Sequence, residues 1–184
     1  HSDRDVPAHV HPHTDDDHGR NLDEMFARLD HASLAPRATA FARRAITLLF
    51  EAEAAAHGLA IEQVHLHEAG ADDALIDILG TALALDELQI GSVSCSVPLP
   101  IGGGRVECAH GSMPVPVPAV AELLRGVAVI GGPVARETIT PTGAALLRAM
   151  VDRFGPAPAM IIDRVGNGAG GRNPTHLPNV VRGL

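Results

Sequence analysis

Apolar side chains recur at helical spacing through most of the first half of the chain, in the pattern of helices that bury one face. Pro36 suits the first turn of such a helix, and Gly58 suits the position just beyond its end. A later stretch is apolar on most sides after Ile76, which indicates a central helix. The pattern therefore predicts three helices, over about residues 21–33, 36–57 and 72–88.

Beyond Gly91, short apolar stretches alternate with glycine and proline, which is typical of short strands joined by loops. Residues 98–104 and 113–118 are interpreted as connections because proline interrupts them. The overall expectation is an α+β (mixed α/β) fold, with a helical first half packed on a small mixed sheet. The expected elements are strands over 92–97, 105–109, 127–130, 159–165 and 179–183, and helices over 119–125 and from Thr140 to about Phe154.

Residues 1–20 form a polar stretch that is rich in His and Asp. It holds too few apolar side chains to offset the entropy lost on ordering, so we expect a flexible arm before a single domain over residues 21–184. A start at His1, with no Met, suggests part of a longer protein. The arm is either a metal-handling tract or a solvated linker, and its candidate ligands are His9, His11, His13 and His18.

Composition narrows the function classes. The formal net charge of -8 argues against a nucleic-acid partner and against an anionic membrane surface. No apolar run is long enough to span a bilayer and no signal peptide is recognisable, which favours a cytoplasmic protein. Cys95 and Cys108 lie on segments that could be neighbouring strands, and two reduced thiols are favoured over a disulfide.

The densest chemistry lies between residues 64 and 80, at the entrance to the third helix. If residues 64–67 are extended, His65 and His67 share a face and can bind one zinc or nickel ion. Glu68 could then act as a base or hold a ligand in place. Two histidines that merely hydrogen-bond at a helix entrance are an equal alternative.

Asp73 and Asp77 lie four residues apart on the third helix and share a face. An acidic residue near a helix start, such as Asp73, has a simple structural explanation. Asp77 has apolar neighbours in Ile76 and Ile78, so its carboxylate is expected to need a cation or a hydrogen-bond donor. This favours a functional role for Asp77.

Two later segments add candidates. Cys108 and His110 could ligate a borderline metal, although a strand cysteine is more often plain core, and His110 is the stronger candidate. Thr140, Thr142 and Gly143 begin a helix and form either a phosphate site or a simple cap. The glycine run at 166–171 is not followed by a helix, so it does not predict a dinucleotide site.

The motifs, taken in order, resemble the family of nickel insertion proteins that mature the nickel-pincer nucleotide cofactor of lactate racemase. The resemblance covers nearly all of residues 18–184. The segments that carry it are residues 64–70 with Asp73 and Asp77, 98–104, 108–111, 113–119, 140–146, 164–170 and 178–182.

This resemblance implies a nickel chelatase, or cyclometallase, of the lyase class. Such an enzyme inserts Ni²⁺ into a pyridinium bis-thiocarboxylate mononucleotide, assisted by CTP and a divalent metal. It also implies that this chain is the amino-terminal part, incomplete without a carboxy-terminal CTP-binding domain. A homo-oligomer and contact with a lactate racemase-type apoenzyme are further expectations.

The roles that follow are hypotheses. His65, His67, Asp73 and His110 would bind the metal, Glu68 and Asp77 would act in catalysis, and Thr140, Thr142 and Gly143 would face the substrate phosphate. Two other classes remain open, a metal-dependent hydrolase and a non-catalytic scaffold or oligomerisation domain.

Overall fold

The computed structural model describes residues 20–66, 68–108, 111–132, 134–171 and 178–184, and of Glu68 and Ala69 only the backbone. The predicted arm therefore lies outside the described residues. The helices are α1 (Leu22–His31), α2 (Pro36–His57), the 3-10 turn η1 (Ile61–Gln63), α3 (Glu68–Glu87), α4 (Pro118–Leu123) and α5 (Pro141–Met150). The strands are β1 (Ser94–Ser96), β2 (Leu99–Gly102), β3 (Arg105–Cys108), β4 (Gly111–Pro114), β5 (Val129–Gly131), β6 (Arg153–Gly155), β7 (Gly166–Ala169) and β8 (Val180–Gly183).

Local capping chemistry fixes the first two helices. The side chain of Asn21 accepts a hydrogen bond from the Glu24 N–H at 2.9 Å, and the Glu24 carboxylate accepts one from the Asn21 N–H at 3.2 Å. This reciprocal pair satisfies two N–H groups that the start of α1 would otherwise leave open. Pro36 occupies the first turn of α2, and Gly58 follows its end with a φ of 66°. The range predicted for α2 is confirmed.

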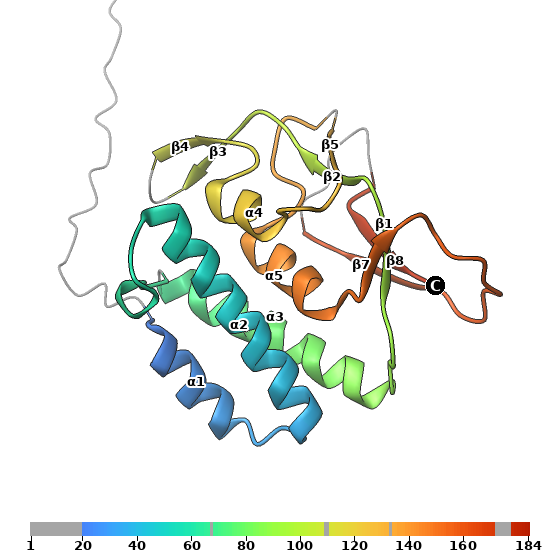
Figure 1. The fold of residues 1–184 in the computed structure, drawn as a ribbon, viewed down its shortest axis with the longest axis horizontal. Coiled ribbons are helices and arrows are strands. Elements are labelled where there is room, and N and C mark those ends of the chain that lie inside the picture. Colours follow the sequence, from blue (N-terminus) through green and yellow to red (C-terminus); the bar gives the residue numbers. More distant parts are fainter. Residues whose placement is uncertain (1–19, 67, 109–110, 133, 172–177) are drawn as a thin grey trace, which may run out of the picture.

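The central helix is α2, which packs against α1, α3, α4 and α5 (Figure 1). Its buried residues are mostly alanines, and small side chains let neighbouring helices approach closely. The expectation that the third helix is central is wrong, because Ile76 and Leu83 on α3 are 67% and 51% exposed. That helix also begins at Glu68, ahead of the expected Asp72.

Two clusters of buried side chains meet along α2. One contains Met25 and Leu29 of α1, with partners on α2 and α3. The other joins α2 to α4, α5 and β2, with Val120 and Leu123 among its members. Since burial of apolar area is the main favourable contribution to folding, α2 is the element on which both clusters depend.

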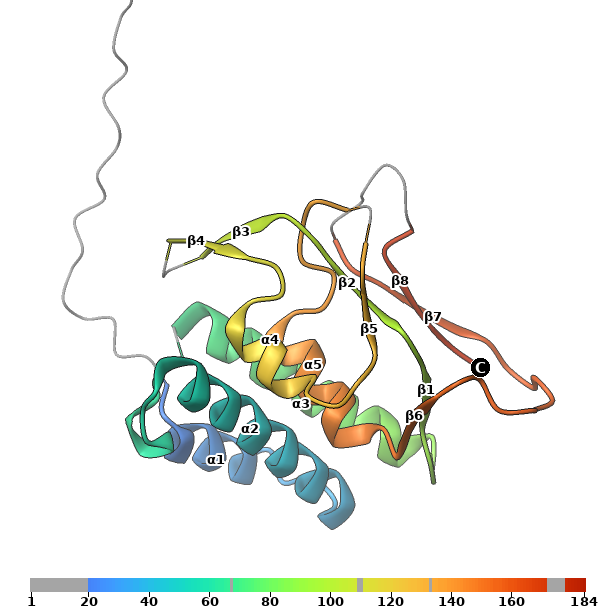
Figure 2. The ribbon, with the colours of Figure 1, turned by 45° about the horizontal axis from the view of Figure 1, so that its top comes forward.

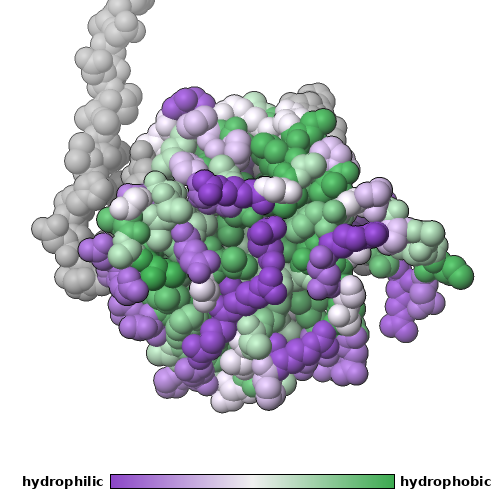
Figure 3. Space-filling model, viewed as in Figure 1, coloured by the Kyte–Doolittle hydropathy of each residue, from purple (hydrophilic) through white to green (hydrophobic). Residues whose placement is uncertain are grey.

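The strands lie together on one side of the helices (Figure 2). Pairs β1–β6 and β2–β5 are parallel, and pairs β3–β4 and β7–β8 are antiparallel. The mixed α+β class is confirmed, but the single small sheet is wrong: among the described residues the strands form separate two-stranded pairs. Figure 3 shows hydrophobic surface on this side, where Val129 and Ile130 of β5 are 43% and 53% exposed.

Several strand boundaries differ from the expectation. Strands β2 and β4 lie in segments interpreted as connections, and β6 lies where the last helix was expected to continue. Residues 159–165 contain no strand. In the described part of the chain, no helix has both the length and the apolar character to cross a membrane.

Both cysteines are free, which agrees with the preference for reduced thiols. The expectation that they lie on neighbouring strands is wrong. Cys95 pairs with Phe154 of β6, whereas Cys108 pairs with Gly111 of β4. Cys95 is half-buried, and this burial raises the pKa of its thiol.

Candidate functional site

A groove of about 710 Å³ opens between the end of α2, the β3–β4 hairpin and the first turns of α4 and α5. Figure 1 shows the end of α2 and the hairpin on the same side of the molecule. The described lining is mostly apolar, with a few polar side chains, which is the usual composition of a small-molecule site. The polar members are Glu53, His57, Gln63, His65, Cys108 and Glu137.

The chain brings His65 to the groove by turning sharply after α2. Gly58 adopts the left-handed conformation that ends the helix, and η1 follows. Leu66 then bridges Arg20 through two backbone hydrogen bonds of 2.8 and 2.9 Å, which holds this segment extended. His65 is exposed, and His67, with which it was predicted to share a face, lies outside the described residues.

The β3–β4 hairpin supplies another wall. Val106 pairs with Met113, and both line the groove. Cys108 lies at the tip, exposed, and its thiol donates to the Gly111 carbonyl at 3.3 Å. The interpretation of Cys108 as plain core is therefore wrong, since this side chain lines a solvent-accessible cavity.

The start of α5 completes the surroundings through Pro141. Next to it, the Thr140 hydroxyl accepts the Gly143 N–H at 3.1 Å, which is the simple cap considered for this turn. The cap already uses the Gly143 N–H, and Pro141 has none. Three donors of this turn therefore remain for a phosphate. They are the backbone N–H of Thr142 and the hydroxyls of Thr140 and Thr142.

Glu137 reaches the groove because its segment packs closely on β2. Gly102 has a φ of 80°, and any side chain there would collide with the carbonyl of Arg136. This close approach permits an antiparallel bridge between Gly102 and Glu137. A glycine at this position therefore fixes where the Glu137 backbone lies.

On α2, Glu53 and His57 are one turn apart and form a polar contact in the groove. The His57 Nε2 and Glu53 Oε2 atoms lie 3.7 Å apart, with side chains 38% and 22% exposed. Neither these two residues nor Glu137 were among the candidates predicted from the sequence. A Glu and a His four residues apart at a helix end were the available signal.

The aspartates of α3 do not line the groove. Asp73 and Asp77 are exposed, so the argument that Asp77 needs a partner in apolar surroundings is wrong. The paired aspartate is Asp72, which lies 3.1 Å from Arg20 Nε and 3.4 Å from Arg28 Nη1. The Arg20 guanidinium, assisted by Arg28, holds the pKa of the Asp72 carboxyl below its usual value.

Other candidates fall outside what the structure describes. His67 and His110 lie outside the described residues, as do the arm histidines, and of Glu68 only the backbone at the start of α3 is described. Within the described ranges, no three His, Cys, Asp or Glu side chains converge as metal ligands. The structure brings together His65, Cys108, Met113 and the starts of α4 and α5, which come from four of the motifs.

The model of the nickel insertion protein family matches residues 3–184. The chain belongs to this family. A provisionally named nickel insertion protein of Geotalea uraniireducens is 48% identical over 163 residues, covering 89% of this chain and 42% of that protein. A pyridinium-3,5-bisthiocarboxylic acid mononucleotide nickel insertion protein of Staphylococcus epidermidis is 39% identical over 165 residues, covering 90% and 41%.

The family relationship, expected from the ordered motifs, is thus confirmed. The chain spans less than half of the length of these relatives. No solved structure matches it. Within the family match, residues of four motifs line the groove, those at 64–70, 108–111, 113–119 and 140–146.

Proposed function

We propose that this chain forms part of an enzyme that inserts Ni²⁺ into pyridinium-3,5-bisthiocarboxylic acid mononucleotide, and that the groove is where insertion occurs. The name of the Staphylococcus epidermidis relative supports the substrate. The observation that carries the location is that His65 and Cys108, distant in sequence, line one cavity. Imidazole suits a borderline cation such as Ni²⁺, and sulfur ligands on the substrate can then compete for it.

In this proposal, nickel is cargo and must be held loosely enough to leave. His65 binds the ion in the groove, and His67 and His110 are its further proposed ligands. Glu68 accepts a proton or orients a histidine. The apolar side chains of Val106 and Met113 offer a surface for the flat pyridinium ring.

Asp73, Asp77 and the α5 turn are weaker members of the proposed site. The exposed carboxylates of Asp73 and Asp77 would bind Ni²⁺ before the ion enters the groove. Thr140 and Thr142 would hold the substrate phosphate through their hydroxyls, since the Gly143 N–H is engaged in the cap. The arm histidines His9, His11, His13 and His18 would deliver nickel.

The described groove offers no cationic side chain for the triphosphate of CTP. The described lining contains two carboxylates and neither Lys nor Arg, a charge distribution that disfavours a triphosphate. We therefore assign CTP and its divalent metal to the carboxy-terminal domain that the family resemblance implies. A cytoplasmic homo-oligomer that delivers its product to a lactate racemase-type apoenzyme completes the proposal.

The test is a nickel insertion assay with the full-length protein, followed by mass spectrometry of the nucleotide. We expect His65→Ala to lower the insertion rate by about tenfold or more, because one lost metal ligand costs more than about 1.4 kcal/mol. His31→Ala is the matched control, since His31 is an exposed histidine on α1 that does not line the groove. Equal rates for His65→Ala and the control would contradict the groove as the site, and turnover of a phosphoester instead of insertion would favour a hydrolase.

A further inference from the structure

Two acidic side chains enter the groove from different parts of the chain. Glu53 comes from α2 and Glu137 from the segment between β5 and α5. His57 and His65 accompany them, and the described lining holds no Lys or Arg. A partly enclosed cavity lined by carboxylates and imidazoles favours a divalent cation over an anion.

The nucleotide substrate has the opposite character. A bis-thiocarboxylate carries two anionic groups and a mononucleotide carries a phosphate, so the molecule is anionic despite its pyridinium nitrogen. Like charges brought together in a partly desolvated cavity repel each other strongly. The described lining is therefore expected to favour Ni²⁺ and to disfavour the metal-free nucleotide.

We propose that Glu53 and His57 form a chelating pair that receives Ni²⁺, and that nickel must bind before the anionic substrate can. The inference rests on the proposed function and assigns two further residues and an order of binding to it. Nickel neutralises the groove, and the thiocarboxylate sulfurs then occupy the coordination positions that the protein leaves open. The metal–imidazole and metal–carboxylate bonds break as the metal–sulfur bonds form, with no change in oxidation state.

The geometry of the pair is close to that of a chelate. Two ligand atoms each about 2.1 Å from a divalent metal, at a right angle, lie about 3 Å apart. His57 Nε2 and Glu53 Oε2 are 3.7 Å apart, so the two atoms would approach by about 0.7 Å to share one ion. One turn of helix separates the two residues, which holds both ligands on one face.

The pair also sits where a helix favours a cation. His57 is the last residue of α2, and Gly58 ends the helix directly after it. The carbonyl groups of a helix carboxy-terminus carry a partial negative charge that stabilises positive charge nearby. This contribution adds to the charge of Glu53 and requires no rearrangement of the backbone.

Nickel titration of the 184-residue chain tests the pair. The arm histidines are first replaced by Ser in all samples so that binding at the arm does not mask the groove. Glu53→Gln and His57→Gln are each expected to weaken nickel binding about tenfold or more, the loss of about 1.4 kcal/mol or more. Glu51→Gln on the exposed face of α2 and His31→Gln on α1 are the matched controls and should leave the affinity unchanged.

A nickel affinity in the two groove variants equal to that of the controls would overturn the chelating pair. Circular dichroism of each variant shows whether it is folded, so a loss of binding through unfolding is recognisable. The titration involves no nucleotide. Its outcome is therefore independent of whether the full-length protein inserts nickel, and the two proposals fail separately.

The order of binding is tested by calorimetry with pyridine-3,5-dicarboxylate, a dianion of the same ring geometry. We expect at least about tenfold tighter binding in the presence of Ni²⁺ than in its absence, through about 1.4 kcal/mol of relieved repulsion and new coordination. Glu137→Gln should strengthen the metal-free binding. Equal affinity with and without nickel would overturn the proposed order.

Discussion

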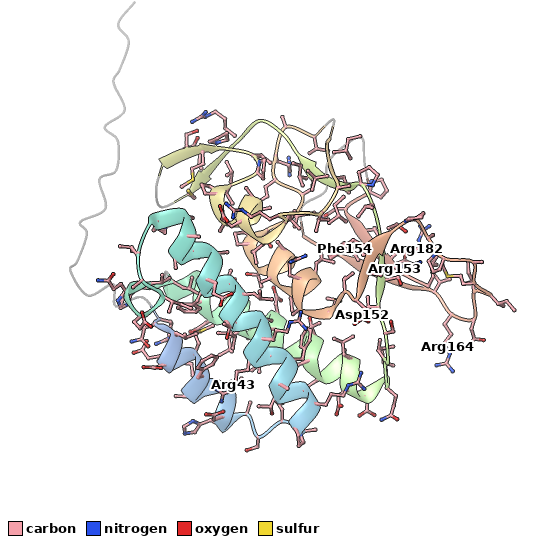
Figure 4. The ribbon with its side chains drawn as sticks, in the orientation of Figure 1. Arg43, Asp152, Arg153, Phe154, Arg164 and Arg182 are labelled. Atoms are coloured by element: carbon pink, nitrogen blue, oxygen red, sulfur yellow. The ribbon has the colours of Figure 1, made fainter. Side chains whose placement is uncertain are left out.

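At the scale of single residues, Asp152 shows how one carboxylate connects two parts of the fold. Its Oδ2 accepts hydrogen bonds from the Val93 N–H and the Ser92 hydroxyl, each at 2.9 Å. Figure 4 shows Asp152 where α5 leads into β6, beside the start of β1. The Val93 N–H and then the Ser92 hydroxyl hold the pKa of Asp152 below its ordinary value of 3.8.

This lowered pKa predicts a pH-dependent contribution to stability. A carboxyl whose folded pKa is depressed stabilises the protein at pH values above its unfolded pKa, here 3.8, and the contribution is lost as pH falls through the folded pKa. Asp152→Asn is therefore expected to lower the free energy of unfolding at pH 7, with the difference narrowing below about pH 4. Urea denaturation at pH 7 and at about pH 3 measures the difference in the free energy of unfolding between the variant and the unmodified chain.

The control for Asp152→Asn is Asp163→Asn, because Asp163 lies in a surface loop with its side chain 90% exposed. The control should leave stability unchanged at both pH values. A difference for Asp152→Asn that stayed constant from pH 7 to pH 3 would contradict the assigned role of the charge.

The aspartates of α3 show what a sequence pattern omits at this scale. Apolar neighbours made Asp77 look like a buried charge, yet Asp77 and Ile76 are both exposed. The 3.6-residue periodicity of a helix reveals which residues share a face, but it does not reveal which face another helix covers. The ion pairs of Asp72 with Arg20 and Arg28 depend on tertiary structure and could not be predicted from spacing.

At the scale of elements, α3 is a helix with one buried face and one apolar exposed face. Ile78 is fully buried between α2 and its neighbours, while Ile76 is 67% exposed. The two residues have identical side chains on one helix, so they offer a matched comparison of packing without a change in helix propensity.

Replacing each isoleucine by alanine measures the orientation of α3. Ile78→Ala should lower the free energy of unfolding by about 2–5 kcal/mol, through lost burial and the cavity left behind. Ile76→Ala should change it by about 0.5 kcal/mol or less. Equal losses in chemical denaturation would mean that the exposed face of α3 is also packed.

The helices were predicted better than the strands, for a physical reason. Helix signals are local, as in the capping box of Asn21 and the Pro36 and Gly58 ends of α2. The strands have three or four residues each, and pairs such as β1–β6 join segments far apart in sequence. Proline marked residues 98–104 and 113–118 as connections, although β2 and β4 form there.

At the scale of the whole molecule, the groove is assembled from the ends of elements that span Glu53 to Pro141. His65 and the α5 turn could be predicted as candidates, since each lies in a short motif whose residue types alone indicate metal or phosphate binding. The sequence could not show that they surround one cavity, nor that Glu53, His57 and Glu137 join them. Glu53 and His57 are one turn apart on α2, and Glu137 joins the same lining through the bridge at Gly102.

The same architecture predicts an uneven distribution of stability. Helix α2 belongs to both buried clusters, so its central amides should exchange with solvent only when the whole domain unfolds. Every residue of the β7–β8 pair is exposed, and a two-stranded ribbon is at best marginally stable alone. Hydrogen–deuterium exchange should therefore label residues 166–169 and 180–183 early and residues 42–54 last. If the ribbon were protected as strongly as α2, it would have to be covered by a partner or by further chain.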